Sequence, residues 1–240
     1  MLKVLIIIPT YQEAASVNEL FDRLETFREE NSLAMNYLVI DSNSPDGTSK
    51  IISNLKLENL ELIVQSQKDG IGPAYRVGFE KGFESDFDFF VQMDADLSHQ
   101  PEQLLDLLNA ADNHHLIIGS RWIKGGAVIN WPSWRRYVSK FGTGYASKIL
   151  NLRYKDLTSG FRVLPRDLVK ELNFDQIKSR GYGFQIEVAM QAVNLGYEIK
   201  EIPITFTERQ GGKSKMTPGI IFEAWKMVTI GGIKRLFKYR

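Results

Sequence analysis

Residues 89–99 read FFVQMDADLSH, an apolar run that stops at two aspartates separated by one alanine. A continuous apolar run of this length is typical of a strand that is covered on both faces, as in a parallel sheet. Two carboxylates placed so close together repel each other, and each resists ionisation. The stretch therefore predicts a buried strand that ends in a charged loop with a function.

Similar short apolar runs recur in the first half of the chain, with helix-like segments between them. The predicted strands are Val4–Ile8, Tyr37–Ile40, Leu62–Val64, Phe89–Met93 and Leu116–Ile118. The predicted helices are Ala15–Glu30, Thr48–Leu55, Gly72–Gly82 and Pro101–Ala111. This alternation predicts an α/β fold with a mostly parallel sheet flanked by helices.

Polar clusters follow four of the predicted strands, at residues 9–13, 41–44, 65–72 and 94–98. The carboxyl ends of parallel strands meet at one edge of a sheet, and ligands bind in the crevice beyond that edge. We therefore expect the four clusters to form one site.

The composition limits the kinds of partner. The chain has 240 residues, enough for one full-sized core, and its 30 basic and 29 acidic side chains nearly cancel. With this balance and no nucleic-acid-binding module, we expect no nucleic-acid partner. The chain has no cysteine, which excludes disulfides and thiolate metal sites. Its apolar runs are shorter than the ~20 residues of a membrane span, so we expect a soluble or peripheral protein.

A long segment of the second half contains basic residues and no acidic ones. Residues 113–155 lack Asp and Glu, and they include Arg121, Lys124, Arg135, Arg136, Lys140, Lys148, Arg153 and Lys155. A solvated basic face is one interpretation. A segment of this kind beside an acidic site more often serves phosphate groups, and we favour that interpretation.

The last residues, 217–240, mix apolar and basic side chains and carry no acid after Glu223. This pattern is typical of a basic amphipathic segment that lies on a membrane surface. The alternative is a C-terminal helix docked on the core.

The two aspartates have a direct chemical interpretation. A hard divalent ion such as Mg²⁺ or Mn²⁺ removes their repulsion and often bridges carboxylates to phosphates. In an extended chain Asp94 and Asp96 point to the same side, and Ser98 continues that side as a further ligand. The carboxylate pair of a glycoside hydrolase is the alternative, but its members flank the bond from opposite sides. His99 points away in an extended chain, so we assign it a structural role.

Eight segments of the chain resemble, in the same order, those of family 2 glycosyltransferases with the GT-A fold. They read IIPTYQE, SPDGT, QMDADLSHQPE, GSRWIKGG, NWPSWRR, LTSGFRVL, GYGFQIE and ITFTERQGGKSKM, and they cover roughly residues 3–216. Within the family, the chain is similar to the dolichol-phosphate and polyprenol-phosphate mannose synthases. The resemblance implies a Rossmann-like catalytic domain over residues 1–216 and a membrane-surface segment over residues 217–240.

The resemblance also implies GDP-mannose as the donor and a polyprenyl or dolichyl phosphate as the acceptor. The implied donor-binding residues are Pro9, Tyr11, Glu13, Asp41, Asp94, Ala95, Asp96, Arg209, Ser214 and Lys215. Asp94, Asp96 and Arg121 are the expected catalytic residues, and Asp94, Asp96 and Ser98 are the expected ligands of Mg²⁺ or Mn²⁺. Inversion at the sugar would give a β-linked mannosyl phosphate.

For the acceptor phosphate the implied contacts are Arg121, Arg135 and Arg136, and weaker matches place Gln185 and Glu187 near the sugar. A phosphate monoester is already anionic near neutral pH, so positioning and charge stabilisation suffice without a protein base. The expected location is the cytoplasmic face of a membrane, with the membrane surface as a partner. A small membrane-anchoring subunit is left open.

One departure from the family pattern concerns the donor. The family usually carries two adjacent acids where this chain has Asp41 and Ser42, which bears on the selectivity for the base. The alternatives that stay open are another donor such as UDP-glucose, a sugar-to-sugar transferase, and a non-catalytic nucleotide-binding subunit.

Overall fold

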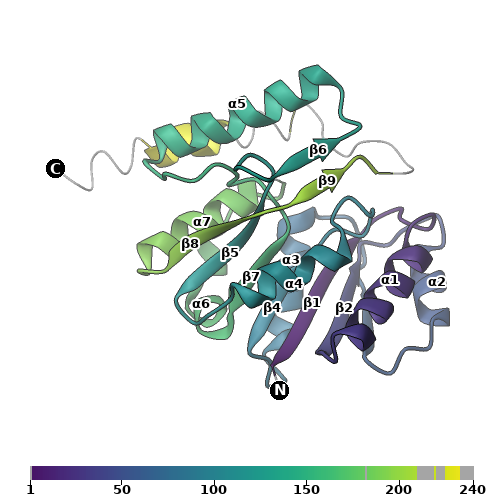
Figure 1. The fold of residues 1–240 in the computed structure, drawn as a ribbon. Coiled ribbons are helices and arrows are strands. Elements are labelled where there is room, and N and C mark those ends of the chain that lie inside the picture. The colour runs from purple at the N-terminus through teal and green to yellow at the C-terminus, as the bar shows by residue number, and fades with distance from the viewer. Residues whose placement is uncertain (1, 182, 210–218, 220–224, 233–240) are drawn as a thin grey trace.

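A seven-stranded sheet forms the centre of the computed structural model, which describes residues 2–181, 183–209, 219 and 225–232. Its strands are β1 (Lys3–Thr10), β2 (Ala34–Asp41), β3 (Leu60–Val64), β4 (Phe89–Gln92), β5 (His115–Ser120), β7 (Arg162–Pro165) and β8 (Glu198–Pro203). They lie in the order β3-β2-β1-β4-β7-β5-β8 (Figure 1). β7 runs antiparallel to β4 and β5, and the other neighbouring strands are parallel. The predicted mostly parallel sheet is confirmed.

Helices cover both faces of this sheet. One face carries α1 (Val17–Glu30), α2 (Thr48–Asn54), the short 3-10 helix η1 (Pro101–Gln103) and α4 (Leu104–Asn109). The other face carries α3 (Ile71–Gly82), α6 (Arg166–Glu171), the 3-10 helix η2 (Phe174–Gln176) and α7 (Gly183–Asn194). Successive strand residues alternate between the two cores, as Ile6 and Ile7 of β1 do, which explains the uninterrupted apolar runs. All the predicted strands and helices are present.

The strand order places the binding crevice. β2 and β3 lie on one side of β1 and β4 lies on the other, so the chain changes direction between β1 and β4. In sheets of this kind ligands bind outside the carboxyl ends of the strands at such a point. The loops after β1, β2, β3 and β4 all leave from this edge, as the sequence predicted.

A second layer lies beyond that edge. The short strands β6 (Ala127–Ile129) and β9 (Thr205–Thr207) pair in parallel, and the helix α5 (Ser133–Ile149) lies above them (Figure 1). The backbone N–H of Thr207 donates to the carbonyl oxygen of Ser98 at 3.2 Å. This bond joins the second layer to the acidic loop after β4.

Part of the C-terminal segment packs on the protein. Residues 225–232 are helical, and the ring of Trp225 stacks on that of Tyr145 in α5, with 6.4 Å between the ring centroids. Val228 is buried in the core under α7. The predicted membrane-surface role of 217–240 stays a prediction; apart from residue 219, the rest of the segment lies outside the described residues. Within the described part of the chain, every helix falls short of the length or apolar character needed to cross a bilayer.

Candidate active site

Asp41, the last residue of β2, joins the end of β1 to the loop after β2. Its carboxylate accepts hydrogen bonds from the Thr10 hydroxyl at 2.7 Å, and from the hydroxyl and the backbone N–H of Ser44 at 2.6 and 2.8 Å. Asp41 is fully buried. These bonds give it a clear structural role, while its contact with a nucleoside stays a prediction. The neighbouring Ser42 donates to the side-chain oxygen of Gln65 at 3.1 Å, which joins the third loop to the first two.

The predicted nucleoside residues Pro9, Tyr11 and Glu13 lie at the end of β1 and in the loop that follows it. Pro9 and Tyr11 are half-buried, and Glu13 is buried with its backbone N–H donating to the Thr48 hydroxyl at 3.0 Å. The ammonium of Lys68 lies 3.8 Å from the centroid of the Tyr11 ring, close enough for a cation–π contact. Sequence reasoning did not single out Lys68, although it is the basic residue of the predicted cluster 65–72.

The two carboxylates of the acidic loop after β4 differ in their exposure to solvent. The Asp94 side chain is 32% exposed, whereas that of Asp96 is 7% exposed. The Asp96 carboxylate accepts hydrogen bonds from the hydroxyl and the backbone N–H of Ser98, and a guanidinium nitrogen of Arg209 lies 2.8 Å away. Burial acts to raise the pKa of Asp96, but Arg209 and Ser98 outweigh it, and the pKa is lowered. Asp96 is therefore a carboxylate at neutral pH.

These oxygen atoms suit a hard divalent ion. Mg²⁺ and Mn²⁺ prefer carboxylate and hydroxyl oxygens, and Mg²⁺ in particular usually keeps several ligands from water or substrate phosphates. Among the described residues no group of three or more His, Asp or Glu side chains is arranged to hold a metal by itself. Asp94, Asp96 and Ser98 offer oxygens of this kind, and their role as metal ligands stays a prediction.

His99 does not point away from the aspartates, and that expectation was wrong. Leu97 has a φ of 61°, so the chain turns instead of staying extended. The turn brings Nδ1 of His99 to the backbone N–H of Asp94, which donates to it at 3.1 Å, and stacks the ring on Phe161. Burial lowers the pKa of His99. The neutral ring holds the acidic loop in place, which agrees with the structural role we assigned to it.

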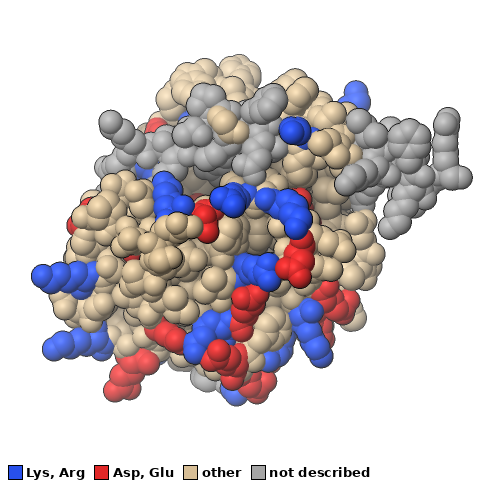
Figure 2. Space-filling view, turned by 180° about the vertical axis from the view of Figure 1, so that it is seen from behind, with Lys and Arg blue, Asp and Glu red and all other residues tan. Residues whose placement is uncertain are grey.

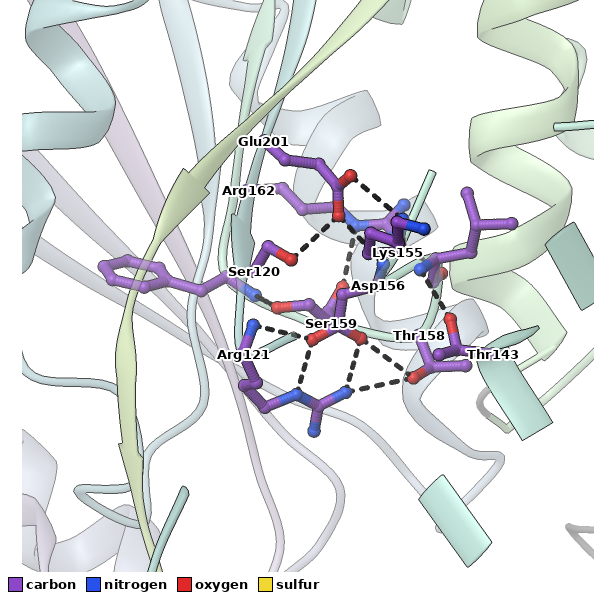
Figure 3. Close-up of polar contacts among 11 residues, drawn as sticks. Ser120, Arg121, Thr143, Lys155, Asp156, Thr158, Ser159, Arg162 and Glu201 are labelled. Atoms are coloured by element: carbon purple, nitrogen blue, oxygen red, sulfur yellow. Dashed lines mark hydrogen bonds and ion pairs between the residues drawn. The ribbon is translucent and has the colours of Figure 1, made fainter. Parts of the chain in front are cut away.

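The guanidinium of Arg121 bonds protein side chains, whereas we expected it to contact a phosphate. Its guanidinium forms two parallel bonds of 2.7 Å with the Asp156 carboxylate and a third, of 3.0 Å, with the Thr158 hydroxyl (Figure 3). Its backbone N–H also donates to Asp156, whose side chain is fully buried. This geometry favours a structural role. Asp156 directly follows the acid-free segment 113–155. As the first acid after this basic segment, it is the residue by which the sequence could have indicated the pair.

The other predicted arginines lie at the start of α5. The Arg135 side chain is 12% exposed, reaches Glu208 at 2.7 Å and lies 4.2 Å from the centroid of the Trp131 ring. Arg136 is exposed and donates to the Val128 carbonyl oxygen at 3.3 Å. Since Glu208 precedes Arg209, the Arg135 contact is one residue away from the ion pair with Asp96. The structure thus brings Arg135 and Arg209 to the same edge.

The remaining residues that were predicted to contact the donor or the sugar are held by other groups, are buried, or lie outside the described residues. The Glu187 carboxylate accepts the backbone N–H groups of Lys178 and Ser179, at 3.1 and 2.9 Å, which gives it a structural role in α7. Gln185 and Ala95 are buried. Ser214 and Lys215 lie outside the described residues. The sugar and donor roles of these residues stay predictions.

Comparison with known proteins identifies the relatives of this chain. Residues 5–172 match the family described as Glycosyl transferase family 2. The undecaprenyl-phosphate mannosyltransferase of Micrococcus luteus is 42% identical over 97% of this chain and 95% of its own length. The polyprenol monophosphomannose synthase of Mycolicibacterium smegmatis is 38% identical over 97% of this chain and 88% of its own length.

The fold is also similar to solved structures. A glucosyl-3-phosphoglycerate synthase from Mycobacterium tuberculosis, crystallised with Mn²⁺, UDP-glucose and phosphoglyceric acid, superposes with a TM-score of 0.72 at 14% identity. The alignment covers 96% of this chain and 79% of that one. At this identity the likeness concerns the fold alone. With its mostly parallel sheet, its acidic loop after β4 and these matches, the chain belongs to glycosyltransferase family 2 and has the GT-A fold.

Proposed function

We propose that this protein transfers mannose from GDP-mannose to a polyprenyl phosphate, with inversion at the anomeric carbon. The observation that carries the proposal is the loop with Asp94 and Asp96 at the carboxyl edge of the sheet. It occurs in a chain whose relatives at 42% and 38% identity are named for mannosyl transfer to undecaprenyl phosphate and to polyprenol. We propose that residues 1–216 are the catalytic unit and that it works at a membrane surface.

The donor side is built from the first three loops and the acidic loop. Asp94, Asp96 and Ser98 would hold a Mg²⁺ or Mn²⁺ ion together with the diphosphate, and the bound ion would stabilise the charge of the departing GDP. Tyr11 and Lys68 offer a ring and a cation at the edge where the nucleoside is expected. Arg209, already beside Asp96, offers a planar cation to the diphosphate.

The acceptor side is built from the start of α5. Arg135 lies at this edge, and an acceptor phosphate there would compete with Glu208 for its guanidinium. Arg121 is less suited to that role because Asp156 and Thr158 hold its guanidinium. The attacking oxygen of the acceptor is anionic and needs no proton acceptor from the protein. This agrees with a His99 ring whose Nδ1 is occupied by a backbone N–H.

A donor panel tests the proposal. The purified protein is given a short polyprenyl phosphate with GDP-mannose, GDP-glucose or UDP-glucose, in the presence of Mg²⁺, Mn²⁺ or EDTA. We expect transfer from GDP-mannose with a metal, none with EDTA, and a β-linked product by NMR. Transfer from UDP-glucose alone would overturn the donor assignment, and full activity in EDTA would overturn the metal. Because Ser42 replaces the usual second acid, GDP-glucose also reports whether the selectivity is for the base or for the sugar.

A further inference from the structure

The first two turns of α7 hold the segment that precedes this helix. One carboxylate oxygen of Glu187, a half-buried residue, accepts the backbone N–H groups of both Lys178 and Ser179, at 3.1 and 2.9 Å. The buried Ser179 also packs on the backbone of Gly183, where a Cβ atom would lie 2.5 Å from the Ser179 hydroxyl oxygen. These contacts fix the backbone of residues 178 and 179 against α7.

The same segment meets the start of α3 backbone to backbone. The carbonyl oxygen of Arg180 accepts the N–H of Gly72 at 3.2 Å. A Cβ atom on Gly70 would lie 2.5 Å from this oxygen, and one on Gly72 would lie 2.7 Å from the carbonyl oxygen of Ser179. Glycine allows so close an approach because it has no Cβ atom. The segment therefore sets the position of the residues with which α3 begins.

The loop 65–72, which ends at this contact, carries a cation of the nucleoside side. The Lys68 ammonium lies 3.8 Å from the centroid of the Tyr11 ring. The loop is bonded at its start to the loop after β2, and residues 178–180 hold it at its end. A loop that is already fixed in place loses less conformational entropy when a ligand binds, so the ligand binds more tightly. Residues 178–180 are therefore placed to influence the affinity for a nucleotide that reaches Lys68.

Charges of both signs are mixed on the surface around α3 and α7. These helices lie on the same face of the sheet, which is the face seen in Figure 2, and acidic and basic side chains are interspersed there. Arg76 of α3, for example, lies 2.8 Å from Glu80 and 3.0 Å from Asp175. A surface of this kind does not select a charged ligand. Glu187 is therefore better placed to act through the loop than to bind a ligand at this surface.

We propose that Glu187 is a positioning residue for the donor nucleotide. It holds residues 178–180, these residues hold the loop 65–72, and the loop places Lys68 over Tyr11, where the proposed function puts the nucleoside. The inference rests on the proposed function for the identity of the nucleotide, but the order of the loop can be measured without any ligand. The alternative is the contact between Glu187 and the sugar that the family resemblance implies.

Calorimetry with two ligands tests the proposal. GDP and GDP-mannose are titrated, with Mn²⁺, into the wild type and into Glu187→Ala. We expect both ligands to bind about tenfold more weakly to the variant, because the displaced loop contacts the nucleotide that they share. Glu187→Gln keeps an oxygen for the two N–H groups and should restore most of the affinity. A loss for GDP-mannose alone would overturn the proposal in favour of a sugar contact, and unchanged binding of both ligands would overturn it outright.

Glu201 supplies the matched control for lost stability. Its carboxylate also accepts two backbone N–H groups, those of Lys155 and Asp156, both at 2.9 Å (Figure 3). It lies in β8, at the opposite edge of the sheet from β3. Glu201→Ala should lower the free energy of unfolding much as Glu187→Ala does, since each leaves two N–H groups without their acceptor, but the GDP affinity should not change. Equal weakening of GDP binding by both variants would show that lost stability alone explains the effect.

Two further variants test whether the effect passes through the loop. When Lys68→Ala is already present, Glu187→Ala should cost little further GDP affinity, because both changes remove the same contact. Gly72→Ala pushes the loop off the Ser179 carbonyl oxygen from the other side and should weaken GDP binding as Glu187→Ala does. It takes the place of Glu187→Ala if that variant does not fold. Additive losses in the first case, or wild-type affinity in Gly72→Ala, would contradict the route through the loop.

Hydrogen exchange separates this inference from the proposed function, because it needs no ligand. The Gly72 amide, which donates to Arg180, should exchange faster in Glu187→Ala than in the wild type, while amides of the central strand β4 keep their rates. Unchanged exchange at Gly72 would overturn the inference. If the exchange is faster and the protein binds UDP in place of GDP, with lower UDP affinity in the variant, the proposed donor fails and the positioning role stands.

Discussion

Two arginine–aspartate pairs of this protein differ in how completely they are enclosed. In the buried pair, Asp156 accepts three hydrogen bonds from Arg121, two from the guanidinium and one from the backbone. In the edge pair, one guanidinium nitrogen of Arg209 reaches Asp96 at 2.8 Å, two residues from the partly exposed Asp94. The resemblance implied site roles for Arg121, Asp96 and Arg209 but not for Asp156, and the surroundings of the two pairs differ.

The difference shows which arginine can change partners. Breaking a buried, fully bonded pair leaves an uncompensated charge in the core and costs several kcal/mol. At the edge, a diphosphate can replace Asp96 as the partner of Arg209, and a divalent ion can replace Arg209 as the partner of Asp96. We therefore propose that the buried pair serves the stability of the protein and that the edge pair takes part in its reaction.

The largest effect is expected from breaking the buried pair. Asp156→Ala leaves the Arg121 guanidinium buried without its carboxylate, and the free energy of unfolding should fall by about 3–5 kcal/mol. Urea unfolding followed by circular dichroism measures this loss. Asp175→Ala removes an exposed carboxylate that pairs with Arg76 and should stay close to the wild type. A loss for Asp156→Ala as small as that of the control would show that Arg121 does not depend on its partner.

The next effect concerns catalysis at the edge pair. Asp96→Asn keeps the shape and a hydrogen bond to Ser98 but removes the negative charge, so mannosyl transfer should fall by about 10²–10³-fold. The melting temperature should fall modestly, because the variant loses the ion pair with Arg209 that helps to lower the pKa of Asp96. Labelled mannose transfer at saturating metal measures the loss. Asp106→Asn, an exposed position in α4, is the control. Activity within tenfold of the wild type would contradict the metal assignment.

A moderate effect is expected when the cation of the edge pair is removed. In Arg209→Gln, Mn²⁺ no longer competes with a guanidinium for Asp96, so without nucleotide it should bind several-fold more tightly. GDP should bind about tenfold more weakly, which corresponds to about 1.4 kcal/mol for one charge-assisted contact. Electron paramagnetic resonance of free Mn²⁺ and calorimetry with GDP measure the two changes. Unchanged Mn²⁺ affinity would show that Arg209 and the metal do not share Asp96.

The smallest effect on stability is expected for an arginine–glutamate pair on the surface. Arg23 bonds both oxygens of Glu102, at 3.0 and 2.6 Å, and lowers the pKa of Glu102 below its ordinary value of 4.5. This stabilisation is present above that value and is lost as the pH falls through the lowered pKa of the folded state. Solvent screens the pair, because the Glu102 side chain is 59% exposed. Glu102→Gln should cost under about 1 kcal/mol at neutral pH.

Unfolding measured from about pH 7 down to about pH 3 checks this prediction, since the wild type and Glu102→Gln should converge at the acidic end. A constant difference across that range would mean that the stabilisation does not come from the ionised carboxylate.

Much of the fold could be predicted from local patterns. The strands β1, β2, β4 and β5 contain apolar runs that are largely buried, β3 is a shorter and partly exposed run, and the helices between the strands show one apolar face. β6 and β9 have three residues each, too few for a periodic signal, and β7 has four. α5 eluded prediction because its first half exposes its apolar residues instead of burying them. The turn at Leu97, whose φ of 61° is unusual for leucine, could not be predicted either, and it reversed the direction of His99.

By itself, the sequence determined the sheet, the edge where its polar loops meet, and the membership of glycosyltransferase family 2. These follow from apolar runs, from the parallel arrangement they impose, and from motifs that are local in the chain. Only the tertiary structure decided which arginine faces which carboxylate, because Arg121 meets Asp156, and Arg209 meets Asp96, only after distant segments have folded together. Whether a charged group can bind a ligand depends on its partners and on its burial. The neighbouring residues in the sequence determine neither.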